Sequence, residues 1–217
     1  VIDNFFHVNS FSGGDLGKTI RIKIDDIIRD GFDKYKEYDT IFMNPCLGKY
    51  FYDFEGDTRE IFKLKNDINH TGDNIAVHFR GTDFHSWEAK SILSSDYYMN
   101  SIDFCHNEHP DHTFVLFTDD KTLPSYKRTI DYLTTNNIKF VEGQKDGPFI
   151  NDFIRMTHCD VIISTPSTFA ICAGFINRQK KIIHSQNWLD YRLSQNDGFW
   201  SDLYNSGNDN YKLYKLI

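Results

Sequence analysis

The sequence predicts an α/β protein built around a doubly wound parallel sheet. From residue 75 onward, short apolar stretches alternate with longer segments of helical pattern, which is the order expected for a parallel sheet with helical crossovers. The 217 residues are enough for one large domain or for two small lobes that share a cleft. With 40% hydrophobic and 25% charged residues, the composition is that of a soluble globular protein.

The elements after residue 75 can be assigned in order. The expected strands are Ile75–Phe79, Thr113–Thr118, Ile138–Glu142, Val161–Ser164 and Lys181–His184. The expected helices are Ser95–Glu108, Leu123–Asn136, Phe149–Thr157 and Ser167–Ile176. Ser94 or Ser95 is a suitable cap for the first of these helices, and the last is rich in small residues that allow close packing on a sheet.

The first 70 residues are less regular. Asp15–Tyr35 carries repeated isoleucines and is interpreted as one helix, Ile41–Pro45 as a strand, and Arg59–Ile68 as a second helix. The polar and aromatic tail after Asn205 predicts a loosely attached extension. We therefore expect a small N-terminal lobe over residues 1–70 and a larger lobe over residues 71–217.

Bulk properties exclude several classes of partner. A net charge of −7 argues against a nucleic-acid backbone as the main ligand. No apolar run approaches the roughly 20 residues that span a bilayer, and the N-terminus lacks a signal-peptide pattern. The four cysteines, Cys46, Cys105, Cys159 and Cys172, form no C-x-x-C motif and are interpreted as thiols in a reducing compartment. We expect a cytoplasmic protein without a membrane span.

The first expected strand of the larger lobe ends in a charged motif, H-x-R-x-x-D, formed by His78, Arg80 and Asp83. Ligands of open α/β sheets bind outside the carboxyl ends of the strands. The planar guanidinium of arginine is suited to a diphosphate because it can make paired charge-assisted hydrogen bonds. The motif therefore predicts a phosphate-binding strand end. The alternative is a surface turn with a local Arg–Asp pair.

Four further motifs occur along the chain in the same order as in a known group of enzymes and carry a resemblance to that group. They are Leu47–Phe51, similar to a "GYFQS" region, Thr118–Asp120 (T-D-D), Asp152–Met156 (D-F-I-R-M) and Ser164–Phe169 (S-T-P-S-T-F). Together with the H-x-R-x-x-D strand end, they resemble the fucosyltransferase superfamily over roughly residues 45–185. This superfamily includes the α-1,2-fucosyltransferases of glycosyltransferase family 11, the α-1,6-fucosyltransferases and the protein O-fucosyltransferases.

The resemblance implies a GT-B-like fold, with a nucleotide-binding lobe and a small acceptor-side lobe. It implies that Arg80 binds the donor β-phosphate and that His78 and Asp152 contact the base or ribose. Ser167 and Thr168 would hold the diphosphate at a helix N-terminus, which suits an anion, although a plain N-cap would have the same sequence.

The T-D-D motif places Asp119 on the donor side. Asp119 and Asp120 could equally be an acidic pair at a helix N-terminus, so their role is left open.

The candidate catalytic base is Glu88, ten residues after His78, the spacing at which the α-1,6 enzymes place a glutamate. An inverting displacement needs a carboxylate near the acceptor hydroxyl. Asp83 and His85 are the alternatives, and Glu88 could instead be a solvated loop residue. Trp87, beside Glu88, is the aromatic residue expected to contact an acceptor saccharide.

Two departures from the family pattern leave the donor open. The family usually has R-R after the histidine, whereas this chain has Arg80-Gly81. The α-1,2 enzymes follow S-T-F with two tryptophans, whereas Ala170-Ile171 stand here. GDP-fucose is the leading donor, and a rhamnosyl donor with another nucleotide is the variant.

We expect no metal and no cofactor, because the chain has no D-x-D triplet. The run His106-x-x-His109-x-x-His112, with Glu108 and Asp111, resembles a metal cluster. Pro110 breaks its register, and it is interpreted as a solvated loop.

The segment Gly13–Thr19 (G-G-D-L-G-K-T) resembles a P-loop, but Ser12 stands where the first glycine is required. The preferred interpretation is the "GGLGNQ" turn of α-1,2-fucosyltransferases with Asp15 inserted, which would put Gly14 on the acceptor side.

The sequence thus predicts an inverting, metal-independent glycosyltransferase that moves a 6-deoxy-L-hexose from a nucleotide-diphosphate sugar to a glycan hydroxyl. The small acceptor side also fits one domain of a larger enzyme. A P-loop phosphotransferase or NTPase and a non-catalytic carbohydrate-binding module are the alternatives.

Overall fold

The computed structural model describes residues 6–8, 18–23, 30–38, 40–44, 62–64, 73–143, 149–176, 181–195 and 212–216. The chain divides into two compact units. The first comprises Val1–Asn66 and Gly198–Ser206, and the second comprises Asp67–Asp197 and Gly207–Ile217. The assignment of these units to acceptor and donor lobes stays a prediction.

The described part of the first unit consists mainly of strands. β1 (Phe6–Val8) pairs antiparallel with β4 (Phe62–Leu64), and β2 (Thr19–Lys23) pairs parallel with β3 (Thr40–Asn44). A short 3₁₀ helix, η2 (Phe32–Tyr35), lies between β2 and β3 in the chain.

The two helices predicted in this unit are therefore wrong, whereas the strand expected at Ile41–Pro45 is confirmed as β3. Ile20-Arg21-Ile22-Lys23 alternates apolar and charged residues with a period of two, which is the pattern of a strand. Isoleucine also has a high propensity for strands because its branched side chain suits a pleated surface. In the other segment, Phe62–Leu64 forms β4 where a helix was expected.

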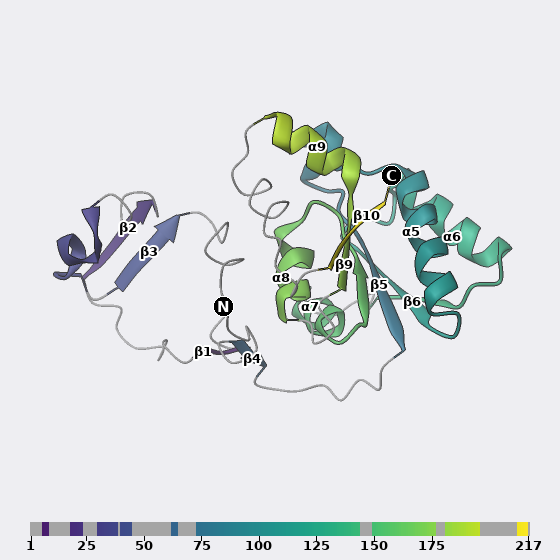
Figure 1. The fold of residues 1–217 in the computed structure, drawn as a ribbon, viewed down its shortest axis with the longest axis horizontal. Coiled ribbons are helices and arrows are strands. Elements are labelled where there is room, and N and C mark those ends of the chain that lie inside the picture. The colour runs from purple at the N-terminus through teal and green to yellow at the C-terminus, as the bar shows by residue number, and fades with distance from the viewer. Residues whose placement is uncertain are drawn as a thin grey trace. The chain divides into compact units, whose positions relative to one another are not determined.

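The second unit contains a six-stranded sheet in which every neighbouring pair is parallel. The strand order is β10-β9-β8-β5-β6-β7, and Figure 1 labels β10, β9, β5 and β6 of this sheet. The strands are β5 (Asn74–Phe79), β6 (Thr113–Thr118), β7 (Phe140–Glu142), β8 (Val161–Ile163), β9 (Lys181–Ser185) and β10 (Lys212–Leu216). The predicted fold class is confirmed.

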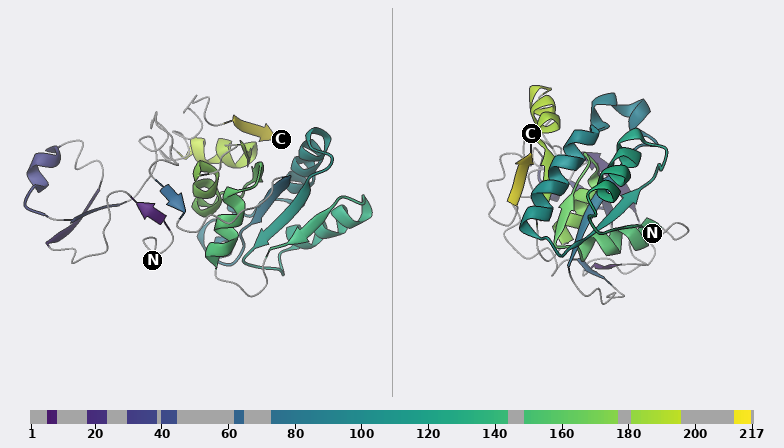
Figure 2. Two further views of the ribbon diagram at one scale, coloured as in Figure 1. Left: turned by 90° about the horizontal axis from the view of Figure 1, so that it is seen from below. Right: turned by 90° about the vertical axis from the view of Figure 1, so that its right-hand side faces the viewer.

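Helices cover both faces of this sheet. Figure 1 and Figure 2 show α5 (Ser95–Glu108) and α6 (Pro124–Thr135) together on one face, and α7 (Phe149–Thr157) and α8 (Thr168–Ile176) on the other. These four helices agree with the predicted ones to within one residue at each end. Ser94 caps α5, because its hydroxyl accepts a hydrogen bond from the backbone N–H of Tyr97.

The core of the second unit lies between the sheet and its helices. Ile75, Ala76 and Val77 of β5 have no exposed surface, as expected for a central strand covered on both faces. α8 packs closely on the sheet, because a Cβ placed on Gly174 would lie 2.1 Å from Cδ1 of Ile182 in β9. The close packing predicted for this small-residue helix is confirmed.

The tail after Asn205 differs from its prediction. Lys212–Leu216 is not loosely attached but forms β10, which pairs in register with all of β9. Its sequence, K-L-Y-K-L, places lysines among apolar residues, as is common on strands at a sheet edge. Among the described residues, no helix has the length and apolar character required to cross a membrane.

The order of the strands creates a switch point beside β5. The chain runs outward from β5 to β6 and β7, and then returns to β8 on the other side of β5 before continuing to β9. At the pairing of β5 with β8, Ile75 lies opposite Val161 and Val77 opposite Ile163. The loops after β5 and β8 therefore diverge to opposite faces and leave a crevice at the carboxyl ends of these strands, which is where doubly wound proteins bind ligands.

Candidate active site

A cleft of about 400 Å³ lies at this switch point. One wall comes from the segment after β5 and the short helix α4 (Phe84–Trp87), and the other from the turn after β8 and the start of α8. The cleft is lined by Arg80, Asp83, Phe84, Trp87, Pro166, Ser167, Thr168 and Phe169. It thus brings together five predicted site residues from two segments that are far apart in the sequence.

Arg80 is fixed in this cleft by two carboxylates. Its Nε donates to Oδ1 of Asp83 at 2.8 Å and its Nη2 to Oδ2 of Asp83 at 3.0 Å, which is a bidentate pair. Its Nη1 lies 3.0 Å from Oδ2 of Asp119. Three of the guanidinium's contacts are thereby directed to protein groups, and its side chain remains 33% exposed. The arrangement orients the guanidinium before any ligand arrives.

Asp119 also organises the loop that carries Arg80. One of its carboxylate oxygens accepts a hydrogen bond from the backbone N–H of Gly81 at 2.8 Å, and the other accepts one from the Thr82 hydroxyl at 2.7 Å. Asp120 has a different role, since its Oδ1 accepts from the backbone N–H and the hydroxyl of Thr122. Of the two acidic residues whose role the sequence left open, only Asp119 contacts the loop after β5.

Gly81 gives a steric reason for the missing second arginine. A Cβ at this position would lie 2.8–2.9 Å from three carbon atoms of Leu123, which is itself almost fully buried. Any larger residue would require Leu123 to move. The second arginine that the resemblance leads one to expect at position 81 would therefore require the buried Leu123 side chain to repack.

His78, the last residue but one of β5, is 5% exposed and lies behind the cleft. Its Nδ1 is hydrogen-bonded to the Thr165 hydroxyl at 2.7 Å, and its ring centroid lies 5.8 Å from that of Phe169. Burial lowers the pKa of His78 to about 4, so the imidazole is neutral at physiological pH. Contact of His78 with a base or ribose stays a prediction.

Ser167 and Thr168 stand at the start of α8 and face the cleft. The Ser167 carbonyl accepts the hydrogen bond of the Ile171 N–H at 3.0 Å and so begins the helix, while Thr168 is exposed. A helix N-terminus carries a partial positive charge and N–H groups suited to an anion. Contact of Ser167 and Thr168 with a diphosphate stays a prediction, and their position at a helix N-terminus favours it.

Asp152 is not among the residues that line this cleft. It lies in the first turn of α7, where a Cβ placed on Gly143 would come within 3.2 Å of its Oδ1. Helices α7 and α8 meet through Phe153 of α7 and Phe169 of α8, whose ring centroids are 5.2 Å apart. The residue that contacts the cleft wall is therefore Phe153, the neighbour of Asp152, and contact of Asp152 with a donor stays a prediction.

Trp87 is the last residue of α4 and Glu88 is its C-cap. Trp87 is 54% exposed and lines the cleft. Glu88 does not line it. Its Oε2 accepts a hydrogen bond from the Tyr191 hydroxyl at 2.7 Å, and its Oε1 accepts one from the Lys90 N–H at 3.2 Å. Sequence reasoning missed Tyr191, because nothing in the chain signals a partner 103 residues away.

Two of the three candidate bases, Glu88 and Asp83, differ in how they are held. The hydrogen bond from Tyr191 lowers the pKa of Glu88, and the hydrogen bond from Arg80 lowers the pKa of Asp83, so both carboxylates are ionised at neutral pH. Asp83 uses both oxygens to hold Arg80. The structure therefore suits Asp83 to a positioning role. Gly14, expected on the acceptor side, lies outside the described residues.

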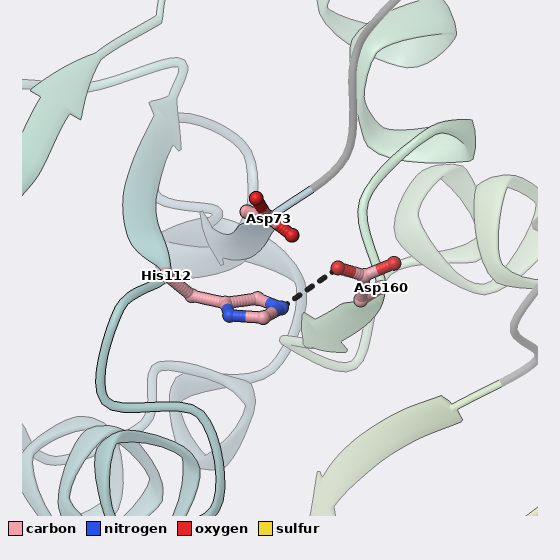
Figure 3. A group of neighbouring side chains, drawn as sticks. All are labelled: Asp73, His112 and Asp160. Atoms are coloured by element: carbon pink, nitrogen blue, oxygen red, sulfur yellow. Dashed lines mark hydrogen bonds and ion pairs between the residues drawn. The ribbon is translucent and has the colours of Figure 1, made fainter.

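A second group of acidic and histidine side chains lies at the opposite, amino edge of the sheet (Figure 3). His112 precedes β6, Asp160 precedes β8 and Asp73 precedes β5. Nε2 of His112 lies 2.8 Å from Oδ2 of Asp160, and the ligand atoms of all three lie within 4.8 Å of one another. Ligands on one zinc ion are only about 3.3 Å apart, given bond lengths near 2 Å and tetrahedral angles. The closest pair, His112 and Asp160, is therefore explained by a direct hydrogen bond between the residues that precede β6 and β8.

The solvated-loop interpretation of the histidine run is wrong in part. His106 and Glu108 belong to α5, and His112 is partly buried against Asp160. The spacing H-x-x-H-x-x-H could not reveal Asp160, because that residue lies 48 positions later in the chain.

The P-loop alternative is also wrong. A P-loop lysine must be followed by a helix that presents its N-terminus to phosphate. Lys18 is followed directly by strand β2, and its Nζ forms an ion pair with Glu37 at 2.5 Å.

Comparison with known proteins agrees with the motifs. The sequence model of the family described as glycosyl transferase family 11 matches residues 49–202, which is well over half of the chain. The match includes the strand end at Arg80 and the turn into α8 that form the cleft, and Asp119, which holds Arg80 in place. A search of curated proteins found no matching relative. The resemblance drawn from the motifs is confirmed, and with it an enzyme of the fucosyltransferase type with a GT-B-like nucleotide lobe: the chain belongs to glycosyl transferase family 11, the α-1,2-fucosyltransferase family.

Proposed function

We propose that the cleft at the switch point binds the diphosphate of a nucleotide sugar, and that the enzyme transfers a 6-deoxy-L-hexose from it to a glycan hydroxyl with inversion and without metal. GDP-fucose is the proposed donor. The observation that carries this proposal is the convergence of Arg80 and the N-terminus of α8 on one cleft, from the two strands that flank the switch point.

Directed hydrogen-bond donors in the cleft support a diphosphate. A guanidinium has five N–H groups, and the two aspartates engage three of its nitrogens, so the remaining N–H bonds are held in a defined direction. The N-terminus of α8 presents N–H groups and about half a positive charge on the facing wall. Asp83 and Asp119 offset the formal charge of Arg80, so the donors would bind a diphosphate through their direction and not through excess charge. Transfer without metal is proposed because the chain has no D-x-D triplet.

The position of Glu88 supports its role as the base. In the proposed step, the acceptor oxygen forms a bond to the anomeric carbon of the donor sugar while the bond from that carbon to the diphosphate oxygen breaks. The diphosphate leaves with the bonding electron pair, and Glu88 takes the proton of the acceptor hydroxyl. Glu88 directly follows Trp87, which lines the cleft, and Tyr191 fixes the orientation of the carboxylate. Attack from the face opposite the leaving diphosphate inverts the anomeric centre.

Thermal unfolding with added nucleotides tests the donor site. GDP, UDP and dTDP, and the corresponding fucosyl and rhamnosyl donors, are compared on the wild type, Arg80→Lys and Arg80→Ala, with Arg128→Ala on the exposed face of α6 as control. We expect GDP and GDP-fucose to raise the Tm by about 5 °C at a hundredfold excess over Kd. Arg80→Lys should weaken this and Arg80→Ala abolish it. Equal stabilisation of wild type and Arg80→Ala would disprove the site.

Product analysis tests the reaction. Incubation with GDP-β-L-fucose and lactose should give an α-linked fucoside, seen in the anomeric proton coupling by NMR, and the rate should not change when EDTA is added. A β-linked product would contradict inversion, and a loss of rate with EDTA that added cation restores would contradict metal independence. Loss of transfer by Glu88→Gln with retained GDP binding would support Glu88 as the base.

A further inference from the structure

A second cavity of about 400 Å³ lies near the donor cleft. Its walls come from the segment that leads into α5 and from α9 (Gln186–Ser194), the helix that follows β9. Its lining includes Lys90, Ser94, Asp96, Asn187, Trp188 and Tyr191. Because α9 begins directly after the last residue of β9, this cavity opens at the same carboxyl edge of the sheet as the cleft.

A pair of tryptophans connects the two cavities. Trp87 lines the donor cleft and Trp188 lines the second cavity, and their ring centroids are 6.1 Å apart. The guanidinium carbon of Arg192 lies 5.8 Å from the first ring and 5.4 Å from the second. The two spaces are therefore neighbours with a shared aromatic partition.

Glu88 lies between the two cavities in the chain. Trp87, before it, lines the donor cleft, and Lys90, after it, lines the second cavity. Tyr191 lines the second cavity, and its hydroxyl donates a hydrogen bond to Oε2 of Glu88 at 2.7 Å. In an inverting transfer the acceptor hydroxyl must lie between the base and the anomeric carbon, so an acceptor subsite must adjoin both the base and the donor cleft. The second cavity adjoins Glu88 through Tyr191 and Lys90, and adjoins the donor cleft through Trp188 and Trp87.

We propose that the second cavity is an acceptor subsite that takes a neutral pyranose unit of the glycan. This inference rests on the proposed function of the neighbouring cleft. The polar groups of the cavity include a donor in Lys90, an acceptor in Asp96, and a side-chain amide in Asn187 that provides both. Vicinal sugar hydroxyls need such a mixture, and the half-buried Ile92 adds an apolar contact for the C–H face of a pyranose, with the buried Leu93 and Trp188 as further parts of the wall.

The charges of the cavity favour a neutral sugar over an anion. Nζ of Lys90 lies 4.1 Å from the centroid of the Tyr191 ring, where a cation–π contact satisfies part of its charge. The Asp96 carboxylate lines the same space and would repel a phosphate or an acidic sugar. Lysine and aspartate together leave the site close to neutral.

The test uses the indole N–H signals of the three tryptophans in ¹⁵N-labelled protein, assigned by Trp→Phe variants. The probes are GDP, lactose and methyl β-D-galactopyranoside, because both saccharides have a free 2-hydroxyl, the position used by α-1,2 enzymes. Titration up to about 20 mM detects a millimolar Kd. We expect GDP to shift the Trp87 signal and the saccharides to shift the Trp188 signal.

Two variants make the test specific. Asn187→Ala should raise the Kd for lactose about fivefold by removing a hydrogen-bonding group and leave the Kd for GDP unchanged. Asn107→Ala, exposed at the far end of α5, is the matched control and should change neither. The absence of a Trp188 shift with both saccharides, or equal lactose affinity in Asn187→Ala and wild type, would overturn the acceptor subsite. Failure of GDP to shift Trp87 would instead count against the donor cleft itself.

Discussion

The carboxylate of Asp119, at the end of β6, lies 3.0 Å from Nη1 of Arg80, at the end of β5. The same carboxylate binds the backbone of Gly81 and the hydroxyl of Thr82. One side chain from a neighbouring strand therefore fixes both the guanidinium proposed to bind the diphosphate and the loop that carries it. Asp119 thus has a structural role in this chain that does not require direct contact with the donor.

Asp119→Ala should destabilise the protein by about 2 kcal/mol, because it removes three polar contacts to the loop after β5 and leaves a backbone N–H without its acceptor. Urea unfolding at neutral pH measures the loss. Asp120→Ala removes the same charge but affects only the turn at Thr122, so it should cost less. Equal losses in the two variants would show that Asp119 does not organise the loop.

Gly81→Ala should cost about 1–3 kcal/mol, because the added methyl group would overlap the side chain of Leu123. In a Leu123→Ala background the same change should cost close to nothing, since the obstructing atoms are gone. Chemical denaturation of the two single variants and the double variant gives the coupling energy. Additive losses would mean that the close contact at Gly81 does not restrict this position.

Acid should destabilise the protein between about pH 6.5 and pH 4. Burial lowers the pKa of His78 and of His184 to about 4 each, whereas both take up a proton near pH 6.5 once unfolded. Their contribution to stability is therefore fully present above pH 6.5 and is lost as the pH falls through about 4. His78→Gln should reduce the slope of unfolding free energy against pH by up to about 1.4 kcal/mol per pH unit in this range. An unchanged slope would contradict the neutral buried imidazole.

Tyr191→Phe should move the acidic limb of the kcat/KM profile to higher pH. The Tyr191 hydroxyl is the main cause of the lowered pKa of Glu88, so removing it lets that pKa rise toward its ordinary value. Tyr132→Phe is the matched control, because its hydroxyl donates to Asp103 on the helices outside both cavities. If the limb stays in place in an active Tyr191→Phe enzyme, Glu88 is not the base.

Sequence reasoning predicted the nucleotide lobe well because its elements are long and their periodicity is unambiguous. The helix Phe149–Thr157 and the strand Thr113–Thr118 have the same bounds in the structure as in the prediction. It failed in the first unit, where isoleucine content outweighed the alternation of Ile20 and Ile22. It also missed β10, because a strand of five residues with two lysines has too few apolar positions to be recognised without its neighbour β9.

The candidate site could be predicted in part. Motifs identified the residues at strand and helix ends, because chemistry there depends on local sequence. They could not identify Thr165 behind His78, Leu123 against Gly81, or Tyr191 on Glu88, since each of these contacts depends on how distant segments pack. The second cavity was not predicted for the same reason.

The hydrogen bond between His78 and Thr165 joins residues that are 87 positions apart. The wall of the cleft that follows β5 is thus synthesised long before the wall that follows β8. β5 cannot pair with β8 until β6 and β7 have been synthesised. Parallel pairing at such sequence separation raises contact order and slows folding. The two walls of the cleft are present together only after β8 and the start of α8 have been made, so a nascent chain that ends before β8 should show no affinity for a nucleotide sugar.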